Sequence, residues 1–190
     1  EEHQLSLQVI RENMLKNHGY YKVTEDGVEQ CLISCDDGVY RFTPPESEEQ
    51  DWTVEKLVDE AASDAVLVDL DQDGEKELIL ISPFHGEHIY FYKKIDGDYK
   101  KVYTYDTADF AHAIYGGTLL GKPAVIIGHR KGERNLLLFT WEQEKGQYQV
   151  EILDRDCGPA NVFKYERGTE EVLISTNREI DEVAMYTFEK

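Results

Sequence analysis

The residues with the clearest capacity for chemistry are histidines and arginines in short polar segments between apolar runs. Five of the six histidines fall in or beside such segments, together with two arginines: His18, His85, His88, His112, His129, Arg130 and Arg178. Loop conformation is satisfied by Gly, Asp, Asn or Ser, so imidazole and guanidinium groups are not needed there for folding. A neutral imidazole can accept a proton or bind a metal ion, and a guanidinium can clamp a carboxylate or phosphate. The pattern therefore predicts a polar pocket for a small molecule or a metal.

A small carbohydrate-type ligand fits this set of side chains. The predicted ligand-binding residues are His18, His129, Arg130, Asn161, Asn177 and Arg178. Neutral His and Asn suit sugar hydroxyls, the arginines suit an anionic group, and nearby aromatic rings could stack on a sugar face: Phe84, Tyr115 and Phe163. Alternatively, two or three histidines with Glu179 or Asp36 could ligate a divalent metal. Both readings stay open.

A second candidate site is an acidic turn. Asp69, Asp71 and Asp73 alternate along one short segment, Gly74 follows, and Glu77 can supply a further oxygen. Carboxylates at alternate positions of a tight loop converge on one point, and Ca²⁺ takes six to eight oxygen ligands. We therefore predict a structural calcium ion held by Asp69, Asp71, Asp73 and Glu77. The alternative is a hydrated Asp turn without an ion.

The elements that position these residues are repeats of strands. Four similar apolar runs end at residues 34, 82, 128 and 175, and each is followed by a polar loop and another apolar segment. The runs are rich in Val, Ile, Tyr and Phe and are bounded by Gly, Asp and Asn, which is typical of strands. Four antiparallel strands per repeat of about 47 residues is the spacing of a β-propeller blade. The only helical candidate, residues 52–62, could equally be a strand with a helical turn.

We therefore predict an all-β propeller domain of four four-stranded blades. Their ranges are about 17–62, 63–109, 110–157 and 158–190, the last with residues 4–10. Leu5, Leu7 and Val9 alternate with polar residues, so this N-terminal strand could complete the last blade and remove an open sheet edge. Equally, the chain could be an arc of a larger propeller. A homodimer would then cover the two exposed edges.

Propeller connectivity sorts the loops onto two faces. Connections between blades emerge on the same face as the loops between the second and third strands of each blade. All the histidine and arginine segments named above belong to this face, which we call the first face. The acidic turn joins the first and second strands of its blade and is expected on the opposite, second face.

Residues 65–82 resemble one repeat of the FG-GAP/VCBS propeller class, which occurs in integrin α-subunit heads and many bacterial proteins. The hallmark of that class is an Asp-x-Asp-x-Asp-Gly turn, present here as Asp69, Asp71, Asp73 and Gly74. The corresponding turns at 24–27, 118–121 and 165–168 keep the glycine and lack the three carboxylates. At most one such metal site is therefore expected.

The resemblance implies two classes of function. Some bacterial and fungal proteins with this repeat type are lyases or dehydratases acting on sugars. By that resemblance the catalytic residues would be His112, His85 and Glu179, with a histidine as general base and an arginine or metal stabilising an enolate in lyase or isomerase chemistry. The alternative is a non-catalytic, calcium-stabilised propeller that binds a ligand or a protein. Clustered histidines favour the sugar-related pocket, because protein-binding surfaces more often expose Trp and Tyr.

Composition excludes several partners. Lysine and arginine total 20 against 39 acidic residues, a net charge of −19, which argues against nucleic acid and against a polybasic membrane anchor. No apolar run is long enough for a membrane helix. Cys31, Cys35 and Cys157 are expected to be unpaired, which, with no signal peptide at the start, favours a cytoplasmic location. Because the sequence begins at Glu rather than Met, secretion stays open.

Overall fold

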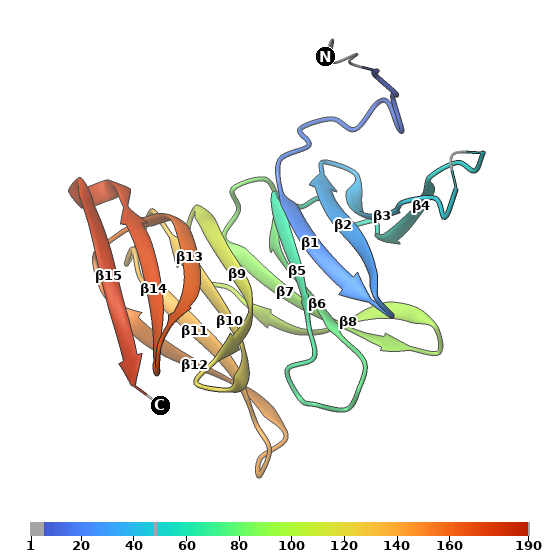
Figure 1. Ribbon diagram of the computed structural model, residues 1–190. Helices are drawn as coiled ribbons and strands as arrows, with labels where there is room; N and C mark the ends of the chain where they lie inside the picture. The colour runs from blue at the N-terminus through green and yellow to red at the C-terminus, as the bar shows by residue number, and fades with distance from the viewer. Residues whose placement is uncertain (1–5, 48, 190) are drawn as a thin grey trace.

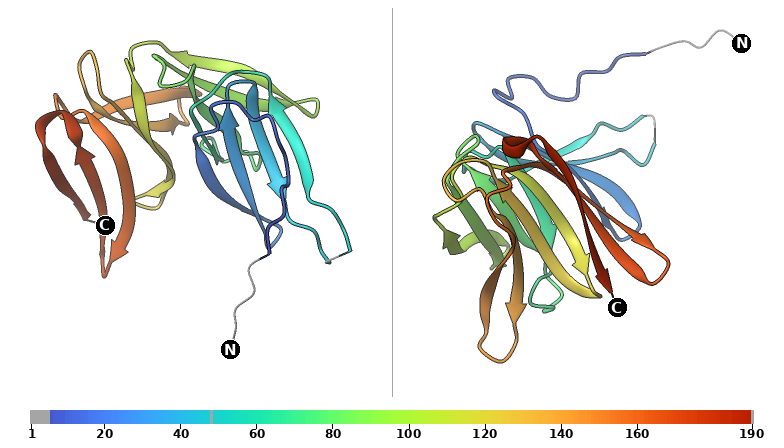
Figure 2. Two further views of the ribbon diagram at one scale, coloured as in Figure 1. Left: turned by 90° about the horizontal axis from the view of Figure 1, so that it is seen from above. Right: turned by 90° about the vertical axis from the view of Figure 1, so that its left-hand side faces the viewer.

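The fold is a series of four antiparallel β-sheets, as Figure 1 shows for the computed structural model of the chain. The structure describes residues 6–47 and 49–189. Seen from above, the sheets follow one another along an arc, with the first and the last at its two ends (Figure 2). The propeller prediction is confirmed, and each sheet is one blade.

The strands run in sequence order from the centre of each blade to its rim. Blade 1 contains β1 (Tyr20–Glu25), β2 (Val28–Cys35), β3 (Gly38–Thr43) and β4 (Thr53–Val58). Blade 2 contains β5 (Asp64–Val68), β6 (Glu77–Ser82), β7 (His88–Ile95) and β8 (Asp98–Tyr105). Blade 3 contains β9 (Ala111–Leu119), β10 (Lys122–His129), β11 (Leu136–Glu142) and β12 (Gln147–Asp154). Blade 4 contains β13 (Pro159–Arg167), β14 (Glu170–Asn177) and β15 (Glu182–Glu189).

The repeated apolar runs lie within the second strands, and in β6 and β10 a neighbouring blade covers each face of the run. In β6, Leu78 and Leu80 pack toward blade 1, whereas Ile79 and Ile81 pack toward blade 3. The same division recurs in β10, where alternate residues pack toward blade 2 and blade 4. Three interfaces between neighbouring blades therefore make up most of the hydrophobic core.

The innermost strands β1, β5, β9 and β13 contact one another in that order. Space is tight there: a Cβ atom at Gly116 of β9 would lie 2.8 Å from the Val66 Cβ and from the Val68 Cγ2 of β5. Glycine lets these two strands approach, so the loops that precede them come together on the first face.

The two ends of the arc decide between the sequence-based alternatives. Residues 6–10 form no strand, and Leu7 and Val9 are 89% and 62% exposed. In the described residues blade 4 has three strands, and none of its partners comes from the N-terminal segment. The closing-strand prediction is therefore wrong for residues 6–10, while residues 4 and 5 lie outside the described residues. The alternative, an arc of a larger propeller, agrees with the structure.

Two smaller expectations are also settled. The helical candidate at 52–62 contains strand β4 instead, which pairs along β3 and completes blade 1. The helix found in the described residues is the 3₁₀ turn η1 (Arg178–Ile180), and no helix there is long and apolar enough to cross a membrane. All three cysteines are free, as expected.

Candidate functional site

Three histidines from three blades meet on the first face. His18 precedes β1, His85 lies in the β6–β7 loop, and His112 lies near the start of β9. Their ring centroids are 4.7 to 5.7 Å apart, and the Nε2 atoms of His18 and His85 are 3.3 Å apart. We call these three residues the histidine cluster. The sequence-based expectation that these loops converge holds for this set.

Backbone carbonyls orient two of the three rings. His18 Nδ1 lies 3.2 Å from the Ser63 carbonyl oxygen, and His112 Nδ1 lies 2.7 Å from the Ala160 carbonyl oxygen. A carbonyl oxygen only accepts hydrogen bonds, so each Nδ1 carries the proton and donates it. In the neutral form each Nε2 then keeps a free lone pair.

His85 is held between two phenylalanines. Its ring stacks on Phe84 with centroids 4.2 Å apart and meets the edge of Phe110 at 4.9 Å. Both His85 and Phe110 have positive φ angles, of 50° and 56°, a conformation that costs a side-chain-bearing residue roughly 1–2 kcal/mol. Such strained positions concentrate at functional sites. A hollow of 430 Å³ lies beside these rings, lined also by Glu87, Asp109 and Lys131.

An arginine–glutamate pair lies next to the cluster. Arg130, in the β10–β11 loop, donates two hydrogen bonds to Glu179 Oε1, at 2.8 Å from Nε and 2.6 Å from Nη2. The guanidinium also lies 4.9 Å from the Phe110 ring centroid. Loops from blades 3 and 4 thus bring one cation and one anion to the same face as the histidines.

Burial keeps two rings of the cluster, His85 and His112, neutral. It lowers the pKa of His85 to about 4, and nearby His112, His18 and Arg130 add to that effect. The pKa of His112 is also lowered by burial, against the opposing effect of its bond to the Ala160 carbonyl. By contrast, the hydrogen bonds from Arg130 lower the pKa of Glu179 and keep it ionised. Imidazole lone pairs and a guanidinium are therefore the groups that this face offers a ligand near neutral pH.

Two predicted ligand-binding residues have internal roles instead. His129 is 1% exposed; its Nδ1 donates to the Lys131 carbonyl at 3.0 Å, and its Nε2 accepts the Asn135 N–H at 3.0 Å. Asn177 is fully buried and bonds to Ser175, Glu182 and Tyr186. Their polar atoms are used to hold the β10–β11 and β14–β15 loops, so we correct both assignments.

The other predicted residues are spread over a wider area. Arg178 is exposed at the start of η1 and lies close enough to lower the pKa of His112. Asn161 and Phe163 are exposed on β13, on the side of blade 4 that faces away from blade 3. Tyr115 bonds to Thr118 further along β9, away from the first face. His88 pairs with Asp106 at 3.0 Å and stacks on Tyr90.

Of the predicted stacking residues, only Phe84 touches the cluster. The aromatic ring that sequence reasoning missed is Phe110, which contacts both His85 and Arg130. Its position two residues before His112 was the available signal, because residues so close in the same connection between blades emerge on the same face. The catalytic roles of His112, His85 and Glu179 stay predictions, and Glu179 is paired in this structure.

The acidic turn lies at the other end of its blade, between β5 and β6 (Figure 1). Ligand atoms of Asp69, Asp71 and Glu77 lie within 4.8 Å of one another. However, the ammonium of Lys93 from β7 contacts Asp71, and it also lies 3.7 Å from Glu77 Oε1 and 3.9 Å from Asp73 Oδ2. A side-chain cation thus occupies the place expected for the calcium ion.

Backbone groups use most of the remaining oxygens of this turn. Asp69, Asp71, Asp73 and Glu77 each accept one backbone N–H, from Gly74, Asp73, Glu75 and Leu70 respectively. Only Asp69 Oδ1 is buried without a partner. The donor set fits calcium only if Lys93 moves away, so calcium at this turn stays a prediction.

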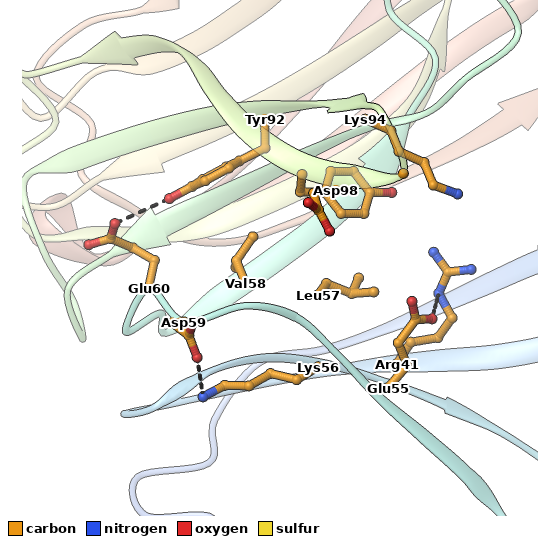
Figure 3. Close-up of a pocket in the computed structure, with 12 residues that line it drawn as sticks. Arg41, Glu55, Lys56, Leu57, Val58, Asp59, Glu60, Tyr92, Lys94 and Asp98 are labelled. Atoms are coloured by element: carbon orange, nitrogen blue, oxygen red, sulfur yellow. Dashed lines mark hydrogen bonds and ion pairs between the residues drawn. The ribbon is translucent and has the colours of Figure 1, made fainter.

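A separate hollow of 480 Å³ lies between β4 of blade 1 and the β7–β8 hairpin of blade 2 (Figure 3). Its charged groups are bonded mainly to one another or to nearby side chains: Lys56 lies 2.6 Å from Asp59, and Tyr92 donates to Glu60 at 3.2 Å. The residues that line it include no histidine. This hollow is the gap that widens as two neighbouring blades diverge from the centre, and we do not assign it a ligand.

Comparisons with known proteins support the architecture. No protein-family model and no curated protein matches the sequence. The solved structures that resemble it include a putative 6-phosphogluconolactonase from Bacteroides fragilis, with a TM-score of 0.59, 17% identity and coverage of 92% of this chain and 50% of that one. Another is a putative 6-phosphogluconolactonase from Bacteroides uniformis, with a TM-score of 0.54, 11% identity and coverage of 91% and 55%.

At these identities the likeness shows the fold alone. The chain spans about half the length of the solved structures that it matches. The β-propeller part of the sequence-based resemblance is thus confirmed, whereas membership of the FG-GAP/VCBS class is not shown.

Proposed function

We propose that the first face binds a small carbohydrate-type molecule that carries an anionic group, with sugar acids and phosphorylated sugar lactones as the class to test first. The observation that carries this proposal is the arrangement of Arg130. Its guanidinium lies over Phe110 and near the neutral rings of His85 and His112. A planar guanidinium suits a carboxylate or phosphate, and imidazole lone pairs accept hydrogen bonds from hydroxyl groups.

Two further points support this class of ligand. The hollow beside His85 has aromatic walls from Phe84 and Phe110, against which the apolar face of a sugar ring can lie. In addition, the similar solved structures are named for an enzyme of a phosphorylated sugar lactone. The catalytic form of the proposal gives the role of proton acceptor to His112 or His85. The alternative form, binding without reaction, uses the same contacts.

Glu179 allows a sharp test, because its carboxylate is bonded to the Arg130 guanidinium and would compete with an anionic ligand for it. Arg130→Gln removes the charge, and we expect it to weaken binding roughly 10- to 100-fold, the worth of a charge-assisted hydrogen bond. Glu179→Gln removes the competing carboxylate, and we expect it to strengthen binding. Arg167→Gln is the matched control, because Arg167 pairs with Glu170 near the β13–β14 turn.

The experiment is isothermal titration calorimetry of the parent and the three variants with the anions 6-phosphogluconate and gluconate, and with uncharged glucono-lactone for comparison. Each titration is done with a chelator and again with added Zn²⁺. Opposite changes for Arg130→Gln and Glu179→Gln, with Arg167→Gln unchanged, support the proposal. Absence of binding by the parent under both conditions, or equal affinities for all variants, would refute it.

A further inference from the structure

The nitrogen atoms of the histidine cluster have the spacing of metal ligands. One ligand atom from each of His18, His85 and His112 lies within 4.8 Å of the others, and the Nε2 atoms of His18 and His85 are 3.3 Å apart. Two nitrogens bound to one tetrahedral zinc ion at about 2.0–2.1 Å lie roughly 3.4 Å from each other. The first pair therefore already has the required separation, and the third nitrogen has to approach by roughly 1.5 Å or less.

The hydrogen bonds made by the other ring nitrogens, Nδ1, also favour a metal site. In metal sites a histidine ligand commonly donates its other N–H to a carbonyl or carboxylate, which fixes the ring and the free nitrogen. His18 and His112 have this arrangement, with Nδ1 bonded to the carbonyls of Ser63 and Ala160. The Nε2 lone pair of His18 faces His85 Nε2. This contact is stable if the Nε2–H of His85 donates a hydrogen bond to His18, or if both nitrogens bind one cation.

Arg130 and Arg178 oppose a positive charge at His112, and the carboxylate of Glu179 lies near both of them. The guanidinium of Arg130 is paired with Glu179, and the chain as a whole carries a net charge of −19. At the acidic turn Lys93 supplies a cation. Among the hydrogen bonds and ion pairs of the described residues, no lysine or arginine bonds to a nitrogen of the histidine cluster.

We propose that His18, His85 and His112 together bind one divalent transition-metal ion, of which Zn²⁺ and Co²⁺ are the first to test. Three imidazole ligands leave a fourth position open, as in zinc sites that bind a water or a substrate oxygen. The ligands come from blades 1, 2 and 3, so the ion would also tie three blades together. This inference goes beyond the proposed function and does not require the sugar ligand. With an ion bound, the three imidazoles act on a ligand through the metal instead of accepting a proton.

The test is a metal titration of the protein without a polyhistidine tag. Zn²⁺ affinity is measured by competition with a chromophoric chelator, and Co²⁺ binding is followed by its visible absorption. We expect one ion per chain for the parent. His85→Asn and His112→Gln should each weaken Zn²⁺ binding at least tenfold, since even residues behind the ligands alter metal affinity by 10- to 100-fold. Asn suits the positive φ of position 85.

His88→Asn is the matched control, because His88 lies on β7 and pairs with Asp106 outside the cluster. It should bind Zn²⁺ as the parent does. Competition with Ca²⁺ distinguishes the cluster from surface carboxylates. Ca²⁺ prefers oxygen ligands, so it should not displace Zn²⁺ that is bound to the imidazoles. Circular dichroism melts establish that each variant is folded before its affinity is compared.

Equal Zn²⁺ affinity in the parent, His85→Asn and His112→Gln would overturn the inference, and so would displacement of Zn²⁺ by equimolar Ca²⁺. Failure of the sugar titrations leaves this result unaffected, since the metal is measured alone. Conversely, a parent protein that binds no Zn²⁺ but binds the sugar ligand in the presence of chelator would refute the metal site and support the proposed function.

Discussion

Asp64 offers a test of how the first face is built, because its carboxyl group is buried at the start of β5. Burial raises the pKa of Asp64 to about 7, and the hydrogen bond from the Ala65 N–H only partly opposes that effect. The folded protein therefore holds a proton that the unfolded chain releases near pH 4. As the pH rises from about 4 to 7, folding must either retain this proton or bury a charge, and the free energy of unfolding falls.

The size of this effect follows from the shift. A rise from 3.8 to about 7 corresponds to roughly 3 units at 1.36 kcal/mol each, or about 4 kcal/mol above pH 7. Since part of the Asp64 side chain is accessible, we expect about 2–4 kcal/mol. Asn has the same shape, keeps an oxygen to accept the Ala65 N–H, and does not ionise. Asp64→Asn should therefore stabilise the protein at pH 8 and have little effect at pH 4.

The assay is the melting temperature of the parent and Asp64→Asn, measured at half-unit steps from pH 4 to 8. For a chain of this length, 2–4 kcal/mol corresponds to roughly 5–15 °C. Asp26→Asn is the control, because Asp26 is an exposed turn residue with a positive φ that Asn also adopts. A constant difference between parent and Asp64→Asn at every pH would show that Asp64 is not buried as described.

Two further predictions concern other parts of the chain. Lys93→Met should create calcium-dependent stability at the acidic turn, because it removes the ammonium that contacts Asp71 while leaving the carboxylates in place. We expect added Ca²⁺ to raise the melting temperature of this variant and not that of the parent, and equal responses would contradict the reasoning. Replacing both Leu7 and Val9 by Ser should change the free energy of unfolding by less than about 0.5 kcal/mol in urea denaturation, since both side chains are exposed. Met14→Ala is the contrasting variant and should be destabilising, because Met14 packs on the outer face of blade 1. A large fall in the free energy of unfolding of the double Ser variant would restore a closing-strand role.

The fold could be predicted because burial on both faces leaves a strong trace in the sequence. The middle of a strand such as β6, covered by blades 1 and 3, is a continuous apolar run, so its recurrence is visible without any structure. Propeller connectivity then assigns each loop to a face. That argument was sufficient to bring His18, His85 and His112 together.

The sequence could not show which groups lie beside these side chains in the folded chain. His129 and Asn177 resemble binding residues until the Asn135 N–H and the Tyr186 hydroxyl are placed beside them. Lys93 reaches the acidic turn because β6 and β7 pair with Leu78 opposite Tyr92, which brings the next residue of β7 toward Glu77. Composition carries no information on such a register, so the calcium prediction could not take this lysine into account.

The arc arrangement also implies a gradient of local stability along the chain. Blades 2 and 3 each share a core with two neighbours, whereas blades 1 and 4 each share an inter-blade core with only one. Amide hydrogens of β6 and β10 should therefore exchange more slowly than those of β13–β15. His85 and His112 belong to the slowly exchanging middle, while His18 and Glu179 belong to the ends. Transient opening of an end blade would then withdraw one side chain from the first face and leave the other groups of the site in position.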